Sequence, residues 1–170
     1  MLIGNFLKNI KKEFKNHQFA GLSFNSEDCK KDYIFFAIKG TKSDGSKFID
    51  DAIKKGATII ISEKKFEGIK NKVLFLRSKN VRKLLSELSY KITKNKPKNL
   101  IAVTGTNGKS SIADFYFQLL NLSNKKVASI GTLGIRTKNN LKNVSNTTLD
   151  PIELSKILND LKKQRIDNVI

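Results

Sequence analysis

The sequence predicts an α/β chain with a small amino-terminal α/β domain, followed by an incomplete parallel-sheet domain. Two patterns predict this class, because short apolar or β-branched runs typical of strands alternate with segments whose apolar residues recur at helical spacing. A third observation divides the chain, since the polar, proline-containing stretch 95–99 separates two such series. We assign residues 1–96 to the first domain and residues 97–170 to the second.

The first domain opens with residues 1–14, whose apolar side chains are spaced as in an amphipathic helix. Residues 48–53 predict a second helix, which Gly56 ends. Apolar or β-branched runs predict three strands: 33–38, 58–61 and 73–76. A closing helix is indicated by one apolar face, formed by Val81, Leu84, Leu85, Leu88 and Ile92.

The second domain alternates strands and helices more regularly. The expected order is strand 100–104, helix 109–121, strand 127–130, a helix from 151 and a strand at 168–170. Residues 136–146 are expected to form a polar loop, and Asp150, Pro151 and Glu153 give the later helix an N-cap and first turn. One face of the earlier helix carries Ile112, Phe115, Tyr116, Leu119 and Leu120.

This order predicts a parallel sheet with right-handed crossovers. Because a doubly wound sheet usually has about five strands or more, we expect the domain to be incomplete and the chain to be an amino-terminal fragment.

The most informative run is 101–111, Ile-Ala-Val-Thr-Gly-Thr-Asn-Gly-Lys-Ser-Ser. A short buried strand, a glycine-flanked turn and a helix opened by hydroxyl residues make the layout of a P-loop-type phosphate cradle, although Val103 replaces the standard first glycine. Lys109 is the candidate catalytic residue, because its charge can reach β- and γ-phosphate oxygens, and Ser110 is the candidate Mg²⁺ ligand. The candidate nucleotide-binding residues are Gly105, Thr106, Asn107, Gly108, Lys109, Ser110 and Ser111.

The chain is strongly basic, with 33 Lys and Arg, 15 Asp and Glu, and a formal net charge of +18. Only four basic residues are arginine, and the lysines are spread along the whole chain. Nucleic-acid readers favour the bidentate arginine fork, so we expect no specific nucleic-acid partner. No run suits a membrane span or secretory signal, and the single Cys29 excludes an internal disulfide. We expect a cytoplasmic monomer with no membrane partner.

These motifs together resemble the Mur ligase family. Residues 103–110 are similar to the family's phosphate loop, which also lacks the first glycine, and residues 129–134 are similar to the strand and turn that follow. Asn146-Thr147-Thr148 resembles a substrate-contacting segment of the branch that adds the third residue of the peptidoglycan stem peptide. Upstream, five segments of this sequence resemble the family's amino-terminal uridine-binding domain: Asn25-Ser26, 33–37, Gly40–Gly45, Phe48-Ile49 and Gly56-Ala57.

The resemblance implies a uridine-binding first domain and ATP-dependent ligation. The implied ligands are ATP with Mg²⁺, a UDP-N-acetylmuramoyl dipeptide and an amino acid, with diaminopimelate the expected one. The substrate-binding residues that it implies are Phe24, Ser26, Thr41, Lys42, Ser43, Asn146, Thr147 and Thr148. Asn25 and Glu27 depart from the family's usual Asp and Arg, and Ser110-Ser111 replaces the commoner Thr-Thr.

Three other interpretations stay open. A Mur-type ligase that adds D-Ala-D-Ala shares much of the pattern, and a non-catalytic nucleotide-binding domain needs only the phosphate cradle. A basic nucleic-acid-binding P-loop module fits the charge, but neither a Walker B carboxylate nor clustered arginines are visible. The chain alone is expected to bind parts of its ligands without turnover, since the family's further catalytic residues lie in later segments.

Overall fold

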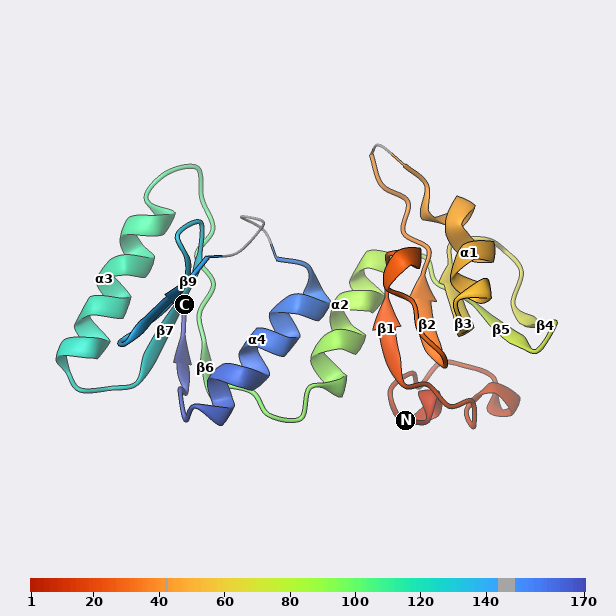
Figure 1. Cartoon of the computed structure of the whole chain (residues 1–170), viewed down its shortest axis with the longest axis horizontal. Coiled ribbons are helices and arrows are strands. Elements are labelled where there is room, and N and C mark those ends of the chain that lie inside the picture. The colour runs from red at the N-terminus through yellow and green to blue at the C-terminus, as the bar shows by residue number, and fades with distance from the viewer. Residues whose placement is uncertain (42, 144–148) are drawn as a thin grey trace. The chain divides into compact units, whose positions relative to one another are not determined.

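The computed structural model describes residues 1–41, 43–143 and 149–170. They form two compact units, Met1–Ile92 and Thr93–Ile170, each with its own five-stranded sheet (Figure 1). Both sheets contain parallel strands, so the α/β class is confirmed. Among the described residues, no helix is long and apolar enough to cross a bilayer.

The sheet of the first unit has the order β1-β2-β3-β5-β4, in which β4 runs antiparallel to β5 and the other neighbours are parallel. Its strands are β1 (Gly21–Ser23), β2 (Tyr33–Phe36), β3 (Ala57–Ser62), β4 (Gly68–Lys70) and β5 (Val73–Arg77). The three strands expected from apolar runs are present as β2, β3 and β5. No pattern indicates β1 or β4, because three residues are too few to show an alternation.

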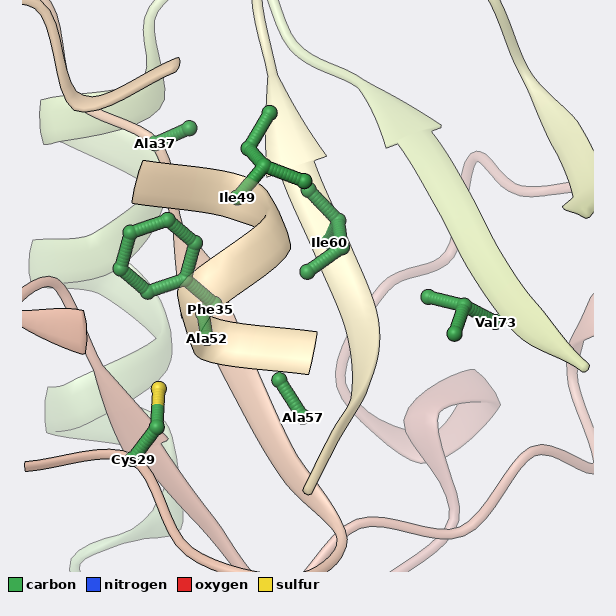
Figure 2. Close-up of a cluster of buried hydrophobic side chains, with 8 residues drawn as sticks. All are labelled: Cys29, Phe35, Ala37, Ile49, Ala52, Ala57, Ile60 and Val73. Atoms are coloured by element: carbon green, nitrogen blue, oxygen red, sulfur yellow. The ribbon is translucent and has the colours of Figure 1, made fainter. Parts of the chain in front are cut away.

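A short helix, α1 (Ile49–Lys54), covers one face of this sheet after a 3-10 turn at Gly45–Phe48. Gly56, at φ +104°, follows the helix as expected. Figure 2 shows the cluster beneath the helix: Cys29, Phe35, Ala37, Ile49, Ala52, Ala57, Ile60 and Val73. Burial in this cluster raises the pKa of the Cys29 thiol, which therefore stays protonated and acts as a small apolar residue.

The longer helix α2 (Val81–Ile92) packs on the opposite face (Figure 1). Side chains alternate along a strand, so Ile34 points away from the α1 side, as does Ile61. Both are fully buried, and so are Leu85 and Leu88 on the expected face of α2.

Residues 1–14 do not form the expected helix. Their regular structure consists of two 3-10 turns, Ile3–Asn5 and Lys12–Phe14. The Gly4 N–H donates to the Lys15 carbonyl at 3.0 Å, so part of this backbone pairs with a later segment and no continuous helix forms. A Cβ on Gly4 would lie 2.6 Å from the Lys15 Cβ, so the glycine permits this close approach.

The sheet of the second unit has the order β6-β10-β7-β8-β9. Its strands are β6 (Asn99–Leu100), β7 (Val127–Gly131), β8 (Gly134–Thr137), β9 (Asn140–Lys142) and β10 (Asn168–Val169). β6, β10 and β7 are parallel, whereas β8 and β9 add an antiparallel hairpin. The polar loop expected at 136–146 is therefore wrong over the end of β8 and over β9, and residues 144–146 lie outside the described residues. β9 is the edge strand of the sheet, where polar residues are tolerated.

The strand expected at 100–104 is shorter and less buried than its apolar sequence indicates. β6 pairs with β10, and the Ile101 N–H still donates to the Val169 carbonyl at 2.9 Å. Leu100 and Ile101 remain 40% and 42% exposed.

Two helices cover opposite faces of this sheet (Figure 1). α4 (Pro151–Lys163) begins as expected, because the Asp150 carboxylate accepts hydrogen bonds from the backbone N–H groups of Ile152 and Glu153 at 2.8 and 2.9 Å. Its stripe packs in the cluster formed by Ala128, Ile135, Leu158, Leu161, Ile166 and Val169.

α3 (Lys109–Leu122) has the expected length but packs through a different face. Phe117 is its buried residue, next to the half-buried Tyr116 and Leu120. The remaining large apolar side chains are mostly exposed: Ile112, Phe115, Leu119 and Leu122. The helix therefore has two apolar faces, of which one contacts the sheet.

Candidate functional site

The candidate phosphate loop lies at the carboxyl edge of the second sheet. The chain leaves β6 there, runs through Gly105 and Gly108, and enters α3 at Lys109. The carboxyl ends of the parallel strands β6, β10 and β7 share this edge, which is where open α/β sheets bind ligands.

Two glycines give the loop its shape. Gly105 has φ +151° and Gly108 has φ +78°, so both adopt left-handed conformations that a side chain would strain. An added Cβ on Gly108 would meet nothing within 4 Å, so the backbone is open to a ligand on that side. No side chain caps α3, whose first N–H groups point out of the helix toward the loop, as in an anion site.

The Lys109 ammonium group is folded back over this loop. Its Nζ donates to the carbonyl oxygens of Gly105 at 2.6 Å and Thr106 at 3.1 Å. The side chain is exposed, so its charge can reach phosphate oxygens above the same loop. Ser110 and Ser111 follow in the first turn and are exposed as well.

A hollow of about 570 Å³ adjoins the loop. Lys109 and Ser110 line it beside apolar residues of the strand edge and α4, including Val103, Ile130 and Leu154. The Ser110 hydroxyl is an oxygen donor of the kind that Mg²⁺ prefers, which fits a metal-bound polyphosphate. Within the described part of the chain, no group of three or more His, Cys, Asp or Glu could hold a metal by itself.

Four other candidate residues that the structure describes lie at the carboxyl edge of the first sheet. Phe24 follows β1 and is 39% exposed, whereas Ser26 opens the 3-10 turn Ser26–Asp28 and is buried. Thr41 and Ser43 are exposed in the loop after β2. Because β1 and β2 are parallel, these two segments leave the sheet at the same edge.

The loop after β2 is closed by backbone hydrogen bonds. The Gly40 N–H donates to the Ser43 carbonyl, and the Gly45 N–H donates to the Ile38 carbonyl, both at 2.9 Å. Asp44 then caps the 3-10 turn, its Oδ1 accepting from the Ser46 N–H at 2.8 Å. This closed loop presents Thr41 and Ser43 to solvent.

Asp44 makes this loop sensitive to acid. Its hydrogen bonds from Ser46, with Lys39 and Lys64 nearby, hold the pKa of the carboxyl below its ordinary value. A carboxyl group whose pKa is lower in the folded than in the unfolded state stabilises the fold when the pH is above its unfolded-state pKa. That stabilisation is lost as the pH falls through the folded-state pKa. We expect melting temperatures to fall below about pH 4, and less steeply in Asp44→Asn, which keeps the amide oxygen but has no charge to lose. Parallel pH–melting curves of the two proteins would contradict this role.

Some candidates cannot be placed. Lys42, Asn146, Thr147 and Thr148 lie outside the described residues. The candidates that are described form two groups: Phe24, Ser26, Thr41 and Ser43 in the first unit, and residues 105–111 in the second.

The structure adds a contact that the motifs do not indicate. Arg136 on β8 pairs with Asp114 on α3, its Nη1 2.5 Å from Oδ1, and its guanidinium group lies over the Phe117 ring, 4.3 Å from the centroid. The signal in the sequence is slight: Asp114 is a charge between apolar neighbours on a helix next to the phosphate loop.

An exposed glycine-flanked loop that leads into a helix at the carboxyl edge of a parallel sheet gives the second unit the layout of a phosphate-binding α/β domain. Residues 18–91 match the Mur ligase family, catalytic domain, and residues 103–170 match the Mur ligase middle domain. The chain belongs to the Mur ligase family.

Curated relatives agree with this assignment. The UDP-N-acetylmuramoyl-L-alanyl-D-glutamate–2,6-diaminopimelate ligase of Rickettsia prowazekii is 42% identical over 163 residues, which are 94% of this chain and 34% of that protein. The protein of the same name from Buchnera aphidicola subsp. Schizaphis graminum is 37% identical over 89% of this chain and 32% of its own length. The chain thus spans about a third of the length of the curated relatives it matches.

Solved structures give the same result. A structure of UDP-N-acetylmuramoyl-L-alanyl-D-glutamate–2,6-diaminopimelate ligase superposes with a TM-score of 0.80 at 27% identity, over 99% of this chain and 35% of that one. A MurF ligase from Thermotoga maritima in complex with ADP has a TM-score of 0.55 at 24% identity, over 87% of this chain and 30% of that one, which is a likeness of fold alone.

Proposed function

We propose that this chain provides the nucleotide-sugar-binding and ATP-binding parts of a cytoplasmic ligase that adds diaminopimelate to UDP-N-acetylmuramoyl-L-alanyl-D-glutamate. The observation that carries the proposal is the glycine-flanked loop at 105–108, with Lys109 opening α3 beside it. The choice of amino acid rests on the relatives, since those compared above at 37% identity or more carry this activity in their names.

In this proposal the second unit holds ATP. Backbone N–H groups of 105–109 cradle the phosphates, and Lys109 exchanges the carbonyls of Gly105 and Thr106 for phosphate oxygens. Mg²⁺, held in part by the Ser110 hydroxyl, would neutralise phosphate charge when bound. Phosphoryl transfer depends on such positioning and charge neutralisation, so these groups suit it.

The first unit would hold the nucleotide sugar at its sheet edge. Phe24 offers an exposed aromatic ring, and Thr41 and Ser43 offer hydroxyl groups from the closed loop. Lys42, Asn146, Thr147 and Thr148 complete the proposed substrate-binding set by resemblance. The ligation itself requires the dipeptide carboxylate to attack the γ-phosphate, giving an acyl phosphate and ADP. The amine of the amino acid then displaces phosphate and forms the amide.

Calorimetric titration of the chain tests the proposal. We expect saturable binding of UDP-N-acetylmuramoyl-L-alanyl-D-glutamate and, separately, of Mg·ATP, and both should persist at a salt concentration that screens the +18 charge. Single-stranded DNA should bind weakly, with an affinity that falls steeply with salt. Salt-resistant DNA binding without nucleotide-sugar binding would instead support the basic nucleic-acid module.

A further inference from the structure

The helix that opens the phosphate site is attached to its unit by few side chains. Phe117 is the residue of α3 that is buried, while Phe115 and Leu119 are 63% and 65% exposed. The orientation of the first turn of α3 therefore depends strongly on the contacts around Phe117.

Arg136 supplies the polar part of those contacts. It lies opposite Ser129 in the β7–β8 register, whereas its neighbour Ile135 points into the cluster under α4. Since side chains alternate along a strand, Arg136 faces α3. There its guanidinium group covers the Phe117 ring and contacts Asp114 at 2.5 Å, so one side chain holds two successive turns of the helix.

Both carboxylate oxygens of Asp114 are engaged. Oδ1 accepts from Arg136, and Oδ2 accepts from the Gln118 side-chain amide, also at 2.5 Å. Asp114 and Arg136 side chains are only 35% and 41% exposed, so solvent screens the pair less than a fully exposed one.

The charge of Asp114 matters to an anion site. Asp114 lies five residues after Lys109, which is about 7.5 Å along a helix axis and within the screening distance of physiological salt. Without Arg136, this carboxylate would repel bound phosphates and also lose its attachment to β8.

We propose that Arg136 is a positioning residue of the phosphate site, which through Asp114 and Phe117 fixes the first turns of α3 and neutralises a carboxylate near the bound polyphosphate. This inference rests on the ATP binding proposed above. According to this proposal, the position of the phosphate site depends in part on a contact between α3 and the β7–β8 hairpin, which lies outside the glycine-flanked loop.

The affinity of Mg·ATP for the 170-residue chain, measured by calorimetry at low and moderate salt, tests the proposal. Arg136→Ala should weaken binding about tenfold, and Arg136→Lys should weaken it less, because the charge remains without the flat guanidinium stack. In Asp114→Asn/Arg136→Ala the repulsion is gone, so the double variant should recover part of the affinity. The control is Lys162→Met, which removes an ion pair with Asp167 on the same unit but away from α3.

A second readout separates positioning from general stability. Amide hydrogen exchange without nucleotide should be faster across the first turns of α3 in Arg136→Ala and unchanged there in Lys162→Met. Wild-type affinity in a folded Arg136→Ala or Arg136→Lys protein would overturn the positioning role while leaving ATP binding intact. A wild-type chain that binds no Mg·ATP would overturn both proposals.

Discussion

Replacing Lys109 by methionine should weaken Mg·ATP binding about 100-fold and leave the fold intact, because charge-assisted hydrogen bonds to phosphate contribute about 1.5–3 kcal/mol. The Lys109 side chain is exposed and its hydrogen bonds go to the carbonyl oxygens of Gly105 and Thr106. Methionine keeps the length and helix propensity of the side chain, so the first turn of α3 should still form. Nucleotide titration with a thermal melt of each protein measures both effects.

The matched control is Lys138→Met, which removes the same charge from an exposed turn between β8 and β9. In a chain of net charge +18, loss of any lysine weakens anion binding slightly through the long-range field. The two variants should differ in Mg·ATP affinity only if Lys109 acts locally on the phosphates. Equal affinities for Lys109→Met and Lys138→Met would show that Lys109 does not contact the phosphates.

Local signals in the sequence predict the elements that frame the site. Asp150 and Pro151 mark the start of α4 because capping depends on neighbouring residues alone, and the observed hydrogen bonds follow that pattern. The strands β2, β3 and β5 could also be predicted locally. Each is buried on both faces and therefore appears in the sequence as an unbroken apolar run. Gly105, Gly108 and Lys109 could be singled out as candidates because their spacing matches the pattern expected of a phosphate cradle.

What sequence periodicity could not decide is which surface an amphipathic segment meets. α3 carries apolar residues on two faces, and nothing local distinguishes Phe117, which is buried, from Phe115, which is exposed. The pairing of Arg136 with Asp114 joins residues 22 positions apart and depends on the β7–β8 hairpin, which the polar composition of 136–146 concealed. The helix expected over residues 1–14 was wrong for a similar reason, because the Gly4 N–H bonds to the carbonyl of Lys15, a contact that local periodicity does not show.

Gly45→Ala should abolish a large part of the affinity for UDP-N-acetylmuramoyl-L-alanyl-D-glutamate and destabilise the first unit by about 1–3 kcal/mol. A Cβ at this position would lie 2.7 Å from both the backbone nitrogen and the carbonyl oxygen of Ile38. Those atoms belong to the main chain next to β2 and cannot turn aside as a side chain can. The loop must therefore open, which breaks the hydrogen bond from the Gly45 N–H to the Ile38 carbonyl and displaces Thr41 and Ser43.

Gly131→Ala is the matched control, because a Cβ there meets nothing within 4 Å and the glycine has no left-handed φ. Gly131 lines the hollow beside the phosphate loop, so Mg·ATP affinity is not part of this control. The variant's affinity for the nucleotide sugar and its melting temperature should stay near those of the wild type. Mg·ATP binding provides the internal control for Gly45→Ala, since Lys109 lies in the other compact unit and its loop should keep its shape. Calorimetry with each ligand therefore distinguishes a local opening of the 40–45 loop from unfolding of the chain. Undiminished nucleotide-sugar binding by Gly45→Ala would exclude that loop from the binding site, because the substitution cannot be accommodated without moving it.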